Sequence, residues 1–97
     1  MKVSRGWSFE RGMVVREPGP AVDPPVLWLH GLGESGMCFE RVLAEPALAG
    51  LRHLVPDLPG YGRSPWPESP PSLAGIVELV AGWLTERGEP PVVVIGH

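Results

Sequence analysis

Short apolar runs separated by glycine- and proline-rich segments predict a chain built around buried strands. Residues 26–29 are apolar throughout, with prolines before them and glycines after, which is typical of a strand buried on both faces. We expect this segment to be a central parallel strand. Further strands are expected at residues 7–9, 13–16, 51–55 and 92–95, the first two forming a hairpin.

The most regular helical pattern covers residues 72–87, where apolar side chains recur at helical spacing. Ser69 or Ser72 can cap the start of this helix, and Gly88 can close its end. The apolar stripe that we expect to be buried consists of Leu73, Ile76, Val77, Val80 and Leu84.

The order of these elements predicts an α/β fold, with about five mostly parallel strands and helices on both faces. The helix expected at residues 39–48 is interrupted by Pro46, so it should be short or kinked. Ligands in such sheets bind beyond the carboxyl ends of the strands. Candidate chemistry therefore gathers at residues 30–36, 57–64 and 96–97.

Composition narrows the classes of partner. The chain has 97 residues and a net charge of −3, so no basic surface for nucleic acid is expected. Cys38 is the one cysteine, which excludes an internal disulfide and a cysteine-based zinc cluster and suggests a small buried thiol in a reducing compartment. Residues 1–9 lack the apolar region of a secretion signal. We expect a soluble cytoplasmic protein with no membrane partner and no metal.

Residues 31–36 read Gly-x-Gly-x-x-Gly after an expected strand and before an expected helix, and Asp57 lies about 20 residues further on. A dinucleotide-binding unit is therefore an alternative. Against it, two extra strands precede the motif, and Asp57 opens a tight turn at residues 57–64. A nucleotide-hydrolysing loop is excluded because Met37 and Cys38 stand where Lys and Ser or Thr are needed.

Three motifs in order resemble those of the α/β-hydrolase superfamily, in its esterase and epoxide hydrolase-like branch. They are Leu29-His30-Gly31 followed by Phe39, the turn at 57–64, and the apolar run that ends in Gly96-His97. The resemblance implies that residues 1–97 are the incomplete N-terminal portion of a single domain, ending just before the nucleophile. It also implies that the third and fourth strands cross over in the sheet.

The resemblance further implies hydrolysis of a small-molecule ester or related bond by a nucleophile, histidine and acid beyond residue 97. No cofactor is expected, and the chain would need its C-terminal half. The backbone N–H of Leu32 would be an oxyanion-hole donor. Apart from the resemblance, the place of Trp66 in a proline-rich loop predicts that it lines the substrate mouth. A non-catalytic truncated remnant stays open as an alternative. The residues expected to support Leu32 are His30, Gly31, Gly33 and His97.

Several other polar residues have plainer interpretations. Ser35 is expected to be a loop or helix-cap hydroxyl, because the next glycine comes too early for a nucleophile elbow. Ser64 and Asp57 are expected to be turn residues, and His53 is expected at the surface. The aromatic residues expected in the core are Trp28, Phe39 and Trp83.

Overall fold

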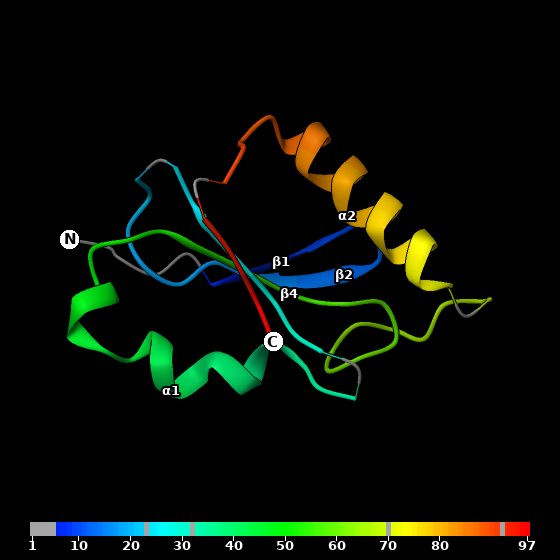
Figure 1. Cartoon of the computed structure of the whole chain (residues 1–97), viewed down its shortest axis with the longest axis horizontal. Coiled ribbons are helices and arrows are strands. Elements are labelled where there is room, and N and C mark those ends of the chain that lie inside the picture. Colours follow the sequence, from blue (N-terminus) through cyan, green and yellow to red (C-terminus); the bar gives the residue numbers. More distant parts are fainter. Residues whose placement is uncertain (1–5, 23, 32, 70, 92) are drawn as a thin grey trace.

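The computed structural model describes residues 6–22, 24–31, 33–69, 71–91 and 93–97, which form a five-stranded sheet with helices packed on it (Figure 1). The strand order is β1-β2-β4-β3-β5. Antiparallel pairs join β1 to β2 and β2 to β4, while β3 pairs in parallel with β4 and β5, so only β2 runs against the rest. The mostly parallel sheet and the crossover of its third and fourth strands are confirmed. The strands are β1 (Trp7–Glu10), β2 (Met13–Arg16), β3 (Val26–Leu29), β4 (His53–Asp57) and β5 (Val93–Gly96).

The helices cover both faces of this sheet, as expected, and Figure 1 shows α2 (Leu73–Arg87) and α1 (Glu40–Leu43) on opposite sides. α1 is flanked by the 3-10 turns η1 (Gly36–Phe39) and η2 (Pro46–Leu48). The expected helix is thus broken into three short pieces, with a proline opening the last one. Among the described residues, no helix is both long and apolar enough to cross a membrane.

The side chains of β3 alternate between two cores, because successive residues of a strand point to opposite faces. Leu27 packs with Trp83 of α2 in one core. Trp28 packs with Phe39 of η1 in the other, their ring centroids 5.1 Å apart. The expected central strand, buried on both faces, is confirmed, and so are the three expected core aromatic residues.

The ends of α2 follow the sequence signals. Ser72 is the N-cap, its hydroxyl accepting a 3.0 Å hydrogen bond from the amide of Gly75. Gly88 is the C-cap, in the left-handed conformation at φ 68° that glycine adopts readily.

The expected buried stripe of α2 is partly wrong. Val80 is buried, but Leu73 is 77% exposed and Val77 is 60% exposed. The side of α2 that faces the sheet is instead set by Trp83. Its ring is fully buried, and its indole N–H donates a 2.8 Å hydrogen bond to Glu10 of β1.

Three details differ from the sequence expectations. β4 begins at His53, so Leu51 precedes the strand. His53 is buried, at 2% exposure, because both ring nitrogens have hydrogen-bond partners that compensate for lost water. Cys38 is exposed instead of buried. Val92, expected to open β5, lies outside the described residues.

Candidate active site

His30 directly follows β3 and joins the loops that leave two neighbouring strands. Its Nε2 accepts a 2.9 Å hydrogen bond from the amide of Leu58, just after β4. An amide can only donate, so the proton of the neutral ring lies on Nδ1, which donates to the carbonyl of Gly31 at 2.8 Å. The buried imidazole also stacks edge-on against Tyr61 at 5.7 Å. Both ring nitrogens of His30 therefore serve to position backbone.

Gly31 meets the end of β5. The amide of His97 donates a 3.1 Å hydrogen bond to the carbonyl of Leu29, which extends the pairing of β3 with β5. A Cβ on Gly31 would come within 2.6 Å of the carbonyl oxygen of His97, a separation that real Cβ atoms essentially never show. Only glycine fits at this approach between the two segments.

Glu34 links the loop after β3 to the end of β5, and we call this meeting of Gly31, Glu34 and His97 the junction. One carboxylate oxygen, Oε1, accepts from the amide of Gly31 at 3.1 Å and from Nδ1 of His97 at 2.8 Å. The bond from His97, and after it the bond from Gly31, lower the pKa of Glu34. Sequence reasoning missed Glu34, whose only signal was its place three residues after Gly31, where a side chain can reach back to a backbone amide.

The structure thus brings His30, Gly31 and His97 together at the carboxyl edge of the sheet. Gly33 follows in the same loop, in the left-handed conformation at φ 79°. Leu32, the expected oxyanion donor, lies outside the described residues.

Asp57 ends β4 and anchors two turns. Its buried carboxylate accepts a 2.6 Å hydrogen bond at Oδ1 from the amide of Gly36 and a 3.0 Å bond at Oδ2 from the amide of Arg63. The guanidinium of Arg16 lies 3.9 Å from Oδ1. This confirms Asp57 as a turn residue and leaves its carboxylate engaged, so it is not placed to bind a ribose.

Strand order also argues against the dinucleotide alternative. In that fold the third strand of the unit lies beyond the second, giving the order 3-2-1. Here β5 lies on the other side of β3, giving the order β4-β3-β5. The Gly-x-Gly-x-x-Gly segment is therefore not the start of a classic dinucleotide-binding unit.

The two serines singled out by the sequence have structural partners. The hydroxyl of Ser64 accepts from the amide of Val14 at 2.8 Å and donates to the carbonyl of Asp57 at 2.5 Å. The hydroxyl of Ser35 caps η1 by accepting from the amide of Met37. Their expected roles as turn and cap residues are confirmed.

Trp66 is 68% exposed and lines a hollow of about 280 Å³ together with Pro59 and Tyr61. Gly60, at φ 85°, allows this arrangement, because a Cβ there would come within 2.5 Å of the Trp66 ring. The ring of Tyr61 also meets the ring of His30 edge-on, so Tyr61 connects this hollow to His30.

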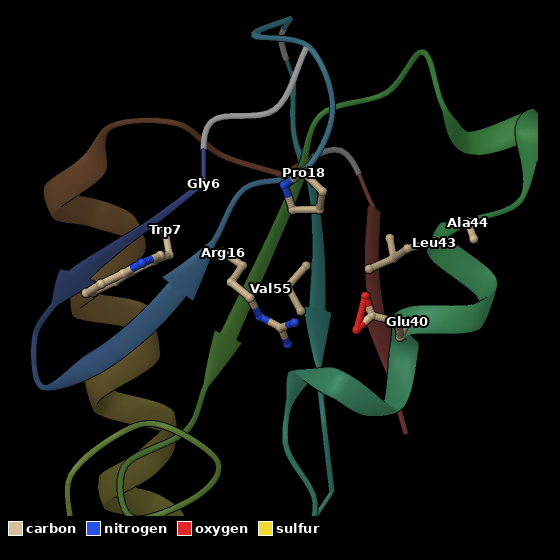
Figure 2. A pocket seen from close by; sticks show the side chains of 8 residues that line it. All are labelled: Gly6, Trp7, Arg16, Pro18, Glu40, Leu43, Ala44 and Val55. Carbon is tan, nitrogen blue, oxygen red and sulfur yellow. The ribbon is translucent and has the colours of Figure 1, made fainter. Parts of the chain in front are cut away.

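A larger hollow of about 370 Å³ lies on the α1 side of the sheet (Figure 2). In Figure 2, Arg16 of β2 and Val55 of β4 face Glu40 and Leu43 of α1. Of the expected site residues that the structure describes, His30, Gly31, Gly33, Trp66 and His97, none lines this hollow.

A family model described as "Alpha/beta hydrolase family" matches residues 26–97. Lipase LipV of Mycobacterium tuberculosis is 37% identical over 83 residues, which cover 86% of this chain and 31% of the lipase. Epoxide hydrolase 3 of Siraitia grosvenorii is 38% identical over 76 residues, which cover 76% of this chain and 24% of that protein. A solved hydrolase from Pseudomonas aeruginosa superposes with a TM-score of 0.78 at 26% identity, covering 95% of this chain and 36% of that one. The chain spans less than a third of the length of these two curated relatives.

Proposed function

This chain belongs to the alpha/beta hydrolase family, and we propose that it is the N-terminal, incomplete portion of one hydrolase domain acting on a small-molecule ester or related bond. The similar proteins named as a lipase and an epoxide hydrolase support this class of substrate. The nucleophile, the catalytic histidine and the acid lie beyond residue 97 in this proposal. In this proposal the chain acts only together with the remaining, C-terminal part of the domain.

The observation that carries the proposal is the double hydrogen bonding of His30. Attack on an ester creates an oxyanion, which needs donors aimed at it in advance. We propose the backbone N–H of Leu32 as one donor. The carbonyl of Gly31 belongs to the same planar peptide unit as that N–H. It accepts hydrogen bonds from His30 at 2.8 Å and from the amide of Glu34 at 3.2 Å, and this support of the Gly31 carbonyl favours the proposal.

The approach of His97 to Gly31 supports the placement of the nucleophile. The carbonyl of His97 lies against Gly31, so a residue following His97 would start beside the oxyanion loop. In this proposal Gly31 permits the close approach of His97, and Gly33 provides the left-handed backbone conformation of the loop. His30 is not the catalytic base in this mechanism, because the contacts of both its ring nitrogens are already used.

We also propose that Trp66 and Tyr61 border the entry of the substrate, since Tyr61 connects their hollow to His30. The negative net charge supports a small-molecule substrate over nucleic acid. We propose a cytoplasmic location, which the single cysteine of this sequence supports.

The first test is the DNA sequence after the His97 codon. A frame that continues with Ser or Asp, then x-Gly, supports the proposal and identifies the nucleophile. A stop codon there would establish the truncated remnant instead.

The whole reading frame would then be assayed with p-nitrophenyl butyrate and styrene oxide. We expect His30→Ala to lower kcat by about 100-fold, the loss typical of an oxyanion donor, with a much smaller change in KM. Glu45→Gln, an exposed carboxylate in η2's N-cap position, is the matched control. Unchanged kcat in folded His30→Ala would refute the role of the His30 bonds.

A further inference from the structure

Three metal-binding side chains of different chemistry converge beside Gly31. Glu34 comes from the loop after β3, Cys38 from η1 and His97 from the end of β5. One ligand atom from each, a carboxylate oxygen, a thiol sulfur and an imidazole nitrogen, lies within 4.8 Å of the other two. We propose that Glu34, Cys38 and His97 form a binding site for a zinc-like divalent transition metal.

The ligand set matches the preferences of Zn²⁺, which binds sulfur, nitrogen and oxygen at roughly 2.0–2.3 Å in tetrahedral geometry. Ligand atoms around such an ion lie about 3.5 Å from one another. Since the three ligand atoms lie within 4.8 Å of one another, side-chain adjustment would bring them to these separations, and the 2.8 Å contact between Glu34 and His97 would open. Water or an added ligand would complete the coordination.

The backbones that carry these ligands are held independently of the metal. His97 is held by its bond to Leu29, and η1 is held by the bond from Gly36 to Asp57. The side chains themselves can adjust, since those of His97 and Glu34 are 65% and 33% exposed and Cys38 is exposed. A pre-positioned backbone with adjustable side chains lowers the ordering cost of binding.

Charge also favours a divalent cation. A thiolate at Cys38 and a carboxylate at Glu34 supply two negative charges, which balance the ion, and His97 adds a neutral donor. A single cysteine excludes a zinc cluster built from cysteines. In the proposed site, by contrast, Glu34 and His97 supply the other ligands.

Metal binding would also affect the backbone of the proposed oxyanion loop. Oε1 of Glu34 accepts a hydrogen bond from the amide of Gly31, and drawing the carboxylate toward a metal would weaken this bond. Zinc is therefore expected to lower kcat of the whole enzyme, a consequence that rests on the proposed function. Binding itself does not, so the two can be tested separately.

Titration with Co²⁺ under reducing conditions tests the site directly, because a cobalt–thiolate bond gives a near-ultraviolet charge-transfer band and tetrahedral cobalt absorbs strongly in the visible. The chain has a single cysteine, so this band can arise only from Cys38. We expect both bands to appear, and Zn²⁺ to displace them. A sample extended by glycines after His97 keeps a terminal carboxylate away from the metal.

Cys38→Ser should abolish the charge-transfer band, and Glu34→Gln and His97→Ala should each weaken Co²⁺ binding by about tenfold or more. Glu45→Gln, with its exposed side chain in another segment, should bind like the parent chain. Circular dichroism establishes that each variant is folded. Absence of the band in the folded parent chain would overturn the site, as would unchanged affinity in both folded Glu34→Gln and His97→Ala. Neither result depends on hydrolytic activity.

Discussion

The indole Nε1 of Trp28 donates a 3.0 Å hydrogen bond to Nδ1 of His53 on the neighbouring strand. The other ring nitrogen of His53 lies 3.0 Å from the carbonyl of Leu48 and donates to it. The two rings also meet edge-on at 5.8 Å. One neutral tautomer of a buried histidine thus links β3, β4 and η2.

Replacing His53 with Leu should lower the free energy of unfolding by about 1–3 kcal/mol, because the N–H of Trp28 and the carbonyl of Leu48 lose their buried partner. Urea denaturation followed by circular dichroism measures the loss. The double variant with Trp28→Phe should lose less than the sum of the two single losses, since the shared bond is counted twice. Additive losses would mean that this hydrogen bond contributes nothing to stability.

Asp57→Asn should destabilise the chain by roughly 3 kcal/mol. The carboxylate accepts from the amides of Gly36 and Arg63, and a carboxamide would turn an NH₂ group toward one of these donors. Thermal and urea unfolding of both proteins would quantify the change. Glu68→Gln removes an exposed carboxylate without this environment and should shift stability by less than about 0.5 kcal/mol. Equal effects of the two substitutions would contradict the anchoring role of Asp57.

Gly62 and Gly12 form a matched pair for testing the crowding around Asp57. Both have positive φ, at 56° and 79°. A Cβ on Gly62 would lie 2.5 Å from Oδ2 of Asp57, whereas nothing lies within 4 Å of a Cβ on Gly12. Gly12→Ala should therefore cost about 1 kcal/mol for its backbone conformation alone. Gly62→Ala should cost about 1–3 kcal/mol more, by overpacking. Similar unfolding free energies for the two variants would show that the turn yields without strain.

The elements with strong local signals were predictable from the sequence. Residues 26–29 became β3 because a continuous apolar run can satisfy both faces of a central strand. Ser72 and Gly88 mark the two ends of α2, as expected, because capping depends on the residue itself and on the backbone next to it. By contrast, the rotation of α2 depends on where the ring of Trp83 finds space, which is a tertiary property.

The site divides in the same way. His30 and Asp57 follow strands whose order was expected, so their positions at the carboxyl edge were predictable. The burial of His53 was not, because it requires partners in β3 and η2 that no local pattern reveals. Glu34 and Cys38 were assigned no site role because their approach to His97 arises only when β5 pairs with β3.

A network of charged residues joins β1 to the end of α2 and to the segment after it. The guanidinium of Arg87 lies 2.6 Å from Glu10 and 3.0 Å from Glu89, and Arg52 lies 2.9 Å from Glu89. The hydrogen bond from Arg52 is the main cause that lowers the pKa of Glu89. Burial raises the pKa of Glu10, but its hydrogen-bond donors, Arg87 among them, together outweigh burial and lower it.

Stability should therefore fall in acid. A carboxyl group whose pKa is lower in the folded state than its ordinary value of 4.5 stabilises the fold above that value, and this contribution disappears as the pH falls through the folded pKa. We expect a nearly constant free energy of unfolding from about pH 8 to 6 and a decline below about pH 5.

Glu89→Gln should be less stable at neutral pH and show a shallower decline, because residue 89 no longer takes up a proton as the pH falls. Glu68→Gln should reproduce the parent profile, since this exposed carboxylate lies outside the network. Urea titrations at each pH supply the profiles, and parallel curves for the parent chain and Glu89→Gln would contradict the assignment of the acid sensitivity to this network.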